Sequence, residues 1–324
     1  MKKVFVSLMT AAVLFTGPAL AADLMPVKAR PAPAPTNPWD IAFGGALMSD
    51  YNFRGISQSQ RGPSVTAYFE TRYNLSSNFQ LYAGSQYYAV DLPTNPSCEC
   101  DFYGGVRPTF GAFAFDFGAI YYYYPKEVGY SGAPGAIAAA LPNGNTTLNN
   151  TDYWEVYGKV TWDVVKDKFA INSSVYYSPD LLNTGADGTY ATIGAKITMP
   201  AFNAPLYGGM QEIGWFVSGE YGHYWIGRTD FDPFVFNVVA GGTELPDYST
   251  WNVGLAFTWK VFTLDLRYYD TDLSREECNI LTADPRSVGG GTASLLNPGG
   301  LRSKLCNSAF IATFKADLTL SSLK

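Results

Sequence analysis

WNVGLAFTWK, residues 251–260, alternates large apolar side chains with polar or small ones without a break. In an extended chain, successive side chains point to opposite sides, so Trp251, Val253, Leu255, Phe257 and Trp259 share one face. The pattern predicts a β-strand with one apolar and one polar face. It returns in residues 262–269 and 310–318, so the chain holds several strands of this kind.

Twelve segments have this pattern and reach the ~9–11 residues that a tilted strand needs to cross a bilayer. We place them near residues 39–54, 63–74, 78–90, 101–109, 112–124, 152–162, 168–178, 189–199, 211–225, 249–259, 261–271 and 308–320. The connections between them are alternately short, or moderate at 200–210, and long and polar, at 91–100, 125–151, 179–188, 226–248 and 272–307. Short turns alternating with long outer loops are typical of outer-membrane barrels. The sequence therefore predicts an all-β fold, an antiparallel transmembrane barrel of about 12 strands.

A soluble β-sandwich is the alternative fold, since it also alternates apolar and polar residues. Aromatic residues gather at the segment ends, as in 121–124, 176–177 and 221–225, which favours the interfacial girdles of a membrane barrel. The charges on the opposite face suit either a sandwich exterior or a barrel lumen. We expect the barrel.

The N-terminal region has the pattern of an exported protein. Residues 1–21 contain, in order, two lysines, an apolar run and the small-residue end Ala-Leu-Ala. This pattern predicts a cleaved signal peptide. Residues 22–38 contain five prolines and predict a periplasmic spacer before a barrel over 39–324. We expect the protein to lie in the Gram-negative outer membrane. Its expected partners are outer-membrane lipid and the barrel-assembly machinery.

The charge balance disfavours nucleic acid as a partner. Removal of Lys2 and Lys3 changes the formal charge from −6 to −8, whereas nucleic-acid binders are basic. Later in the chain we find no run of 18 or more apolar residues, so we expect no membrane-spanning helix. One domain is expected.

Charged residues on the polar face predict a hydrated lumen braced by ion pairs, because charge is costly in hydrocarbon. Seven are acidic and six basic: Glu70, Arg72, Arg107, Asp116, Glu155, Lys159, Lys196, Glu212, Glu220, Asp265, Arg267, Lys315 and Asp317. Twelve strands place the backbone roughly 12 Å from the axis and leave a narrow passage. The loops at 125–151, with its apolar run 136–141, and at 272–307 either fold into that passage or stay outside.

SDYNFRGISQSQRGP, residues 49–63, begins in the upper half of the first predicted strand, 39–54. Continuation of the strand register through this stretch would turn Asp50, Asn52 and Arg54 toward the lumen. We expect Asp50 and Arg54 to form a charged ladder near the outer mouth, with residues 55–62 as the turn.

The four cysteines, Cys98, Cys100, Cys278 and Cys306, predict disulfides in long outer loops of an exported protein. Three connectivities are open: Cys98–Cys100 would close a small strained ring, and cross-pairing would tie the two loops together. The Cys-x-Cys pair lacks a second pair or a nearby histidine, so we expect no metal and no cofactor. The single histidine, His223, faces outward in the strand register, so we expect no Ser/His hydrolase and no enzyme.

The stretch SDYNFRGISQSQRGPSVTAYFE, after an Ala/Gly-rich first strand, resembles the start of the TorF-type porins over residues 43–70. These are predicted Gram-negative outer-membrane proteins. The resemblance implies a pore for small solutes and carries over no substrate or catalytic residue. We expect a porin that passes small hydrophilic solutes or ions by diffusion. The alternatives are a non-conducting barrel whose loops bind a partner, and a soluble secreted carbohydrate-binding β-protein.

Overall fold

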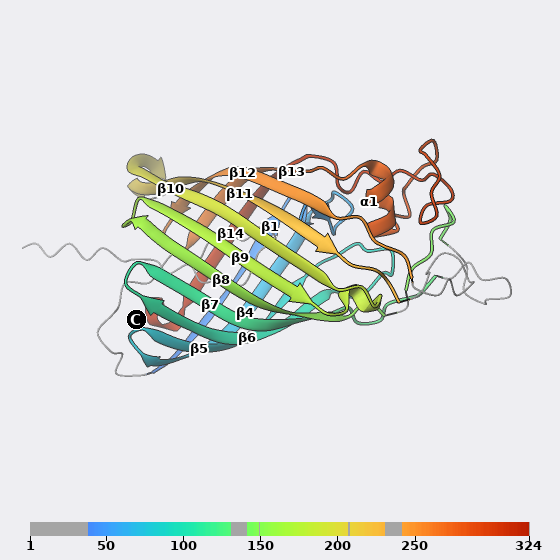
Figure 1. Cartoon of the computed structure of the whole chain (residues 1–324). Coiled ribbons are helices and arrows are strands. Elements are labelled where there is room, and N and C mark those ends of the chain that lie inside the picture. The colour runs from blue at the N-terminus through green and yellow to red at the C-terminus, as the bar shows by residue number, and fades with distance from the viewer. Residues whose placement is uncertain (1–37, 131–140, 149, 207, 231–241, 324) are drawn as a thin grey trace, which may run out of the picture.

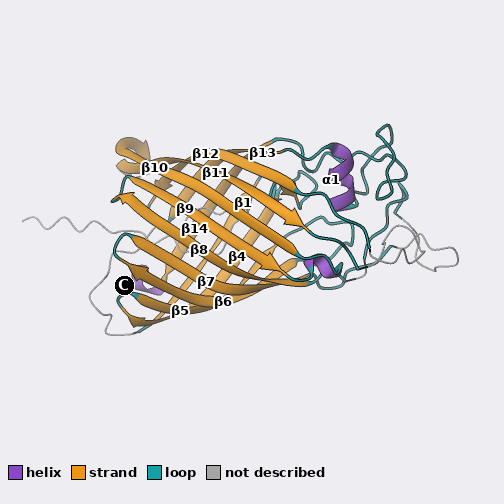
Figure 2. Cartoon of the chain, in the orientation of Figure 1, coloured by secondary structure: helices purple, strands orange, loops and turns teal. Residues whose placement is uncertain are grey.

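Twelve antiparallel strands close into a barrel in the computed structural model (Figures 1 and 2). It describes residues 38–130, 141–148, 150–206, 208–230 and 242–323, so the predicted signal peptide, nearly all of the spacer and the apolar run 136–140 lie outside the described residues. The barrel strands are β1 (Trp39–Met48), β4 (Ser64–Ser76), β5 (Phe79–Tyr88), β6 (Glu99–Phe110), β7 (Phe113–Tyr123), β8 (Tyr153–Val165), β9 (Phe169–Ser178), β10 (Gly188–Leu206), β11 (Gly209–Ile226), β12 (Tyr248–Trp259), β13 (Phe262–Thr271) and β14 (Ala309–Thr319). Each pairs with its neighbour in sequence, and β1 pairs with β14 to close the ring.

The apolar faces of the strands lie on the outside of the barrel. Leu47, Val253 and Phe310 are 62%, 53% and 68% exposed, whereas Glu70 and Glu155 on the inner face are fully buried. A soluble sandwich would bury its apolar face, so that alternative is wrong. An apolar outer surface with a charged interior is the pattern of a barrel that stands in lipid. No helix in the described ranges is long and apolar enough to span a bilayer.

Short turns lie at one end of the barrel and long connections at the other, as the sequence predicts (Figure 1). The C-terminus lies at the turn end. The last long connection contains the helix α1 (Arg275–Thr282) (Figure 2). The helix begins with a capping box in which Ser274 and Glu277 exchange hydrogen bonds. We call the end with the long connections the loop end.

Most of the predicted link at 200–210 is strand instead of loop, because β10 runs to Leu206 and β11 begins at Gly209. The two strands form a two-stranded ribbon beyond the last pairs that join them to β9 and β12. A bulge between Met199 and Phe202 shifts the register by one residue, which moves Phe202 onto the outward face. Glu212 lies exposed on this ribbon, so its prediction as a pore-lining residue is wrong.

Residues 49–63 leave the barrel wall and fold into its interior. β1 ends at Met48, which pairs with Ser64 at the start of β4. After Ser49, which still hydrogen-bonds Ala312 on β14, the stretch between them pairs with no barrel strand. It contains two short strands, β2 (Asn52–Phe53) and β3 (Ile56–Ser57), joined at Arg54 and Gly55. Both joining residues have positive φ, 48° and 86°, which allows a two-residue turn. We call residues 49–63 the inner hairpin; the prediction that the first strand runs to residue 54 is wrong.

Candidate functional site in the barrel interior

The tip of the inner hairpin presses a buried arginine against the far wall of the barrel. The two terminal nitrogens of Arg54 donate to the two carboxylate oxygens of Glu155 on β8, each at 2.7 Å. Tyr122 on β7 donates to the same carboxylate at 3.0 Å. A parallel pair of charge-assisted hydrogen bonds is the strongest contact that a guanidinium makes with a carboxylate. The predicted ladder of Asp50 and Arg54 along the first strand is therefore wrong.

Aromatic rings surround the Arg54 guanidinium. Its central carbon lies 4.9, 4.6 and 5.0 Å from the ring centres of Tyr176, Tyr190 and Tyr224, on β9, β10 and β11, and 4.7 Å from that of Phe53. Burial alone would lower the pKa of Arg54, but the charge of Glu155 and its hydrogen bonds outweigh burial and hold the pKa above its usual value. The side chain is therefore a permanent buried cation.

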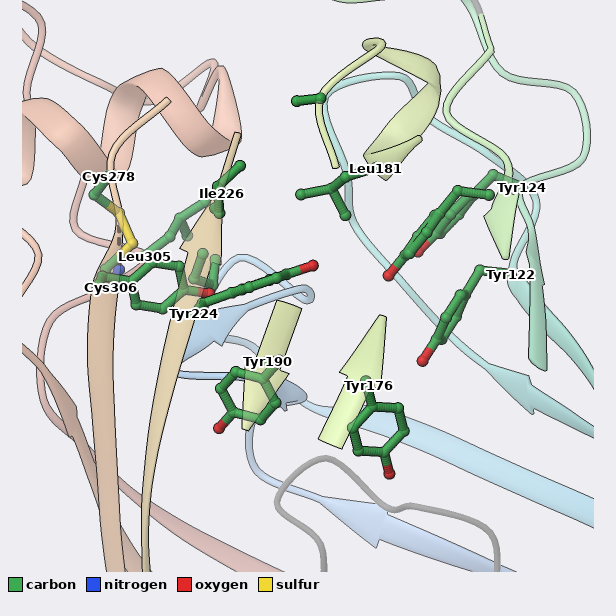
Figure 3. Close-up of a cluster of buried hydrophobic side chains, with 14 residues drawn as sticks. Tyr122, Tyr124, Tyr176, Leu181, Tyr190, Tyr224, Ile226, Cys278, Leu305 and Cys306 are labelled. Atoms are coloured by element: carbon green, nitrogen blue, oxygen red, sulfur yellow. Dashed lines mark hydrogen bonds between the residues drawn. A yellow bond between two sulfur atoms is a disulfide. The ribbon is translucent and has the colours of Figure 1, made fainter. Parts of the chain in front are cut away.

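The cage belongs to a larger aromatic layer at the loop end. Figure 3 shows Tyr122 and Tyr124 facing Tyr224 across the interior, with Tyr176 and Tyr190 between them. Glycine makes room for these rings: a Cβ on Gly222 would lie 2.4 Å from the Tyr190 hydroxyl. Inward tyrosines were not among the predicted lumen residues, because only charge was used to select them.

The base of the inner hairpin is held by polar contacts. Asp50 accepts hydrogen bonds from the hydroxyls of Ser57, at 2.6 Å, and Ser59, at 3.0 Å. Burial raises the pKa of the Asp50 carboxyl, and these two hydrogen bonds act in the opposite direction. Asn52 accepts from the backbone N–H of Gly55 at 3.0 Å. Thus Asp50 and Asn52 stabilise the hairpin itself and do not line a wall.

Two further contacts tie the hairpin to the loop end. Arg61 donates to backbone carbonyls of Lys304, Asn307 and Ser308 at 2.8–3.0 Å. Tyr51 stacks on Tyr88 with ring centres 4.3 Å apart and donates to Glu99. Burial and the Glu99 charge raise the pKa of the Tyr51 hydroxyl, which therefore stays protonated.

Toward the turn end, the interior holds a charged network on β4 to β7. Glu70 accepts from Arg72 at 2.5 Å and from Arg107 at 2.8 and 3.0 Å. Arg107 also pairs with Asp116 at 3.2 Å, and Tyr82 donates to Asp116. These four charges were predicted to line the interior, and the structure brings them together.

The remaining predicted lumen charges lie around the rest of the wall. Arg267 binds Asp265, the Ser218 hydroxyl and the Asn252 amide oxygen, and Lys315 lies 3.7 Å from Asp317. Three others make looser contacts: Lys159 lies over Tyr157 and Tyr176, Lys196 over Phe216, and Glu220 accepts from Asn172. All face the interior, on strands from β8 to β14.

We call the described residues of the 125–151 and 272–307 connections, at the loop end, the cap. Two disulfides form, and neither joins two different connections. Cys98 pairs with Cys100, and Cys278 pairs with Cys306, with Cα atoms 5.7 and 5.8 Å apart. Cross-pairing between the loops is therefore wrong, and so is the placement of Cys100, which lies in β6 instead of a loop. Within the cap, Asn145 and Asn279 exchange amide hydrogen bonds at 2.9 and 3.2 Å, joining the 125–151 and 272–307 connections.

Removal of the second disulfide is expected to loosen the cap. A Cys278→Ser/Cys306→Ser variant should lose roughly 3–4 kcal/mol of stability on the chain-entropy model, because the bridge spans 28 positions. Limited proteolysis should then cut within residues 283–305, where the wild type resists. A Cys98→Ser/Cys100→Ser variant is the control, since its bridge spans only 2 positions. Equal protease resistance in the first variant and the wild type would contradict this role.

The described residues contain no group of three or more histidine, cysteine, aspartate or glutamate side chains that could hold a metal ion. His223 lies beside Trp225 and bonds Ser249 at 2.9 Å. It keeps the outward register in which Tyr221 and Trp225 are half-exposed. The interior thus offers cations, carboxylates and tyrosine rings for binding a solute.

Comparisons with known proteins identify a family. The model of Gcw_chp, described as a bacterial protein of unknown function, matches residues 32–285. No curated protein matches the chain. The resemblance to TorF-type porins stays a prediction beside this family match.

Several solved structures are distantly similar. One, from a study of in-meso crystallization of membrane proteins, covers 87% of this chain and 84% of its own length, with 10% identity and a TM-score of 0.44. An outer membrane channel from Pseudomonas putida F1 covers 89% and 97%, with 8% identity and a TM-score of 0.39. OmpT, an outer membrane protein of Vibrio cholerae, covers 90% and 99%, with 10% identity and a TM-score of 0.35. At this distance the likenesses assign no function.

Proposed function

We propose that this chain, which belongs to the Gcw_chp family of bacterial proteins of unknown function, is an outer-membrane channel for small hydrophilic solutes or ions. The observation that carries the proposal is a closed barrel with an apolar exterior and a charged interior. Such a wall stands in lipid and offers an aqueous solute polar contacts along its axis. The signal peptide predicted from residues 1–21 fits export to that membrane.

The inner hairpin makes this channel narrow. Arg54 and the tyrosines around it occupy the loop-end half of the interior, while the wall arginines Arg72 and Arg267 are paired with Glu70 and Asp265. A solute that enters from the loop end meets the cap first and the inner hairpin second. We therefore expect slow, selective passage instead of the bulk flow of a wide porin.

The test is a conductance measurement in a planar bilayer. Purified protein should give discrete conductance steps, and reversal potentials in a salt gradient should report its ion preference. Heat-modifiable migration on a gel verifies first that the barrel is folded. If the barrel is folded and no conductance steps occur, the channel proposal is rejected and the second candidate function remains.

A non-conducting barrel that binds a partner through its loops is that second candidate. It is favoured by the filled interior at the loop end, where Tyr122, Tyr153 and Tyr224 are each only 4% exposed. Catalysis forms no part of either proposal, because the only histidine, His223, sits on the outward face.

A further inference from the structure

The barrel wall around Arg54 forms a complete binding site for a guanidinium group. No residue of the inner hairpin contributes to this site. Glu155 comes from β8, and Tyr176, Tyr190 and Tyr224 come from the next three strands. These four side chains belong to the barrel, whereas Arg54 and Phe53 belong to a segment that leaves it. The receptor and its occupant are therefore separate parts of the chain.

The receptor matches the chemistry of its occupant. A carboxylate that accepts two parallel hydrogen bonds fits the planar fork of a guanidinium better than the point charge of an ammonium. Ring faces about 5 Å from the cation add cation–π attraction, which is strongest where water is excluded. Tyr122 helps to hold the carboxylate in place by donating to Glu155.

The occupant can be exchanged because the inner hairpin is a tethered connection. It is hydrogen-bonded to the cap through Arg61 and Ser57 and lies outside the barrel ladder. We propose that Glu155, Tyr176, Tyr190 and Tyr224 bind a solute that carries a guanidinium group, and that Arg54 fills this site as an internal ligand. This inference rests on the proposed channel, for which it names the substrate class.

Because Arg54 is attached to the barrel through the inner hairpin, a free solute must compete with it for the site. A group attached by a short segment has an effective concentration in the millimolar range or above, so a free solute must exceed it to displace Arg54. The wild type should therefore bind guanidinium compounds weakly. A variant without the arginine should bind them directly.

Methylguanidinium is the probe, with sodium and methylammonium at equal ionic strength as reference cations. Binding to purified, detergent-solubilised Arg54→Ala protein is measured by calorimetry and by the shift of the unfolding temperature. We expect saturable binding of methylguanidinium, at least tenfold tighter than methylammonium. An Arg54→Ala/Glu155→Gln variant keeps the rings and loses the carboxylate, so its affinity should fall at least tenfold.

Arg228→Ala is the matched control. It removes an arginine whose side chain is 57% exposed and lies 3.8 Å from the exposed Glu244, and this variant should bind the probe as weakly as the wild type. If Arg54→Ala does not fold in buffer, its refolding yield with millimolar methylguanidinium is the readout. No binding to the folded variant, or no gain in its refolding yield, overturns the inference.

The same proteins separate this inference from the proposed function. Conductance of Arg54→Ala that is blocked by methylguanidinium supports both. Calorimetric binding without any conductance supports the site and rejects the channel. Conductance that methylguanidinium leaves unchanged, together with no binding, rejects the site and keeps the channel.

Discussion

Replacement of Glu155 by alanine is expected to lower the free energy of unfolding by about 3–5 kcal/mol, the range found when one partner of a buried ion pair is removed. Arg54 would keep its charge, because a guanidinium does not deprotonate, and it would lose the only carboxylate that the structure shows bound to it within the described residues. Both side chains are almost fully buried, so water cannot replace the lost contact. Urea-induced unfolding in detergent or lipid vesicles measures the loss.

A second ion pair gives the matched control. Glu276 lies 3.6 Å from Arg302 on the surface of the cap, with 28% and 41% of the two side chains exposed. Glu276→Ala should cost less than about 1 kcal/mol, because exposed pairs contribute little. The Arg54→Ala/Glu155→Ala double variant removes both charges and should be more stable than Glu155→Ala alone. Similar losses for Glu155→Ala and Glu276→Ala would refute a structural role for the buried pair.

Removal of the inner hairpin is expected to raise the single-channel conductance several-fold. Met48 and Ser64 are paired neighbours on β1 and β4, so a Gly-Ser turn of about four residues can replace residues 49–63 without strain on either strand. The substitution takes Arg54 and Phe53 out of the interior and leaves every barrel strand intact. Conductance in planar bilayers measures the effect.

The control for this variant is Arg228→Ala, which leaves the hairpin in place and should conduct like the wild type. Heat-modifiable migration must show a folded barrel in both proteins. If a variant without the hairpin has a folded barrel and conducts like the wild type, the narrowest point lies elsewhere, in the cap or in the charged network around Glu70.

Alternation of side chains predicted the strands, and the connection lengths and aromatic segment ends predicted the barrel. Every one of the twelve predicted segments overlaps a strand, because a membrane barrel needs one apolar face per strand. The inward charges, such as Glu70 and Arg267, followed from the same register. The predicted strand ends were less accurate where a strand continues past its neighbours, as β10 does after the bulge at Met199. The local sequence does not show that two strands extend beyond the wall as a ribbon.

The interior could not be predicted at the same level. Asp50, Asn52 and Arg54 have the spacing of a strand. The hairpin that they form is paired locally, but its position inside the barrel depends on contacts with segments far away in sequence. The contact of Arg54 with Glu155 joins residues 101 positions apart. Periodicity carries no information about such pairs. The turn was predicted at residues 55–62 with Arg54 still in the strand, whereas Arg54 itself forms the turn together with Gly55.

The backbone conformation at the tip of the inner hairpin does not favour arginine at position 54. A two-residue turn with positive φ at both positions, as at Arg54 and Gly55, is formed best by Asn-Gly, because asparagine tolerates the left-handed region more readily than a long side chain does. Arginine is held there by its interior contacts against its local preference. We expect relatives without the buried ion pair to carry asparagine at this turn and to lack Glu155. The two positions should then vary together across the family although 101 positions separate them in sequence.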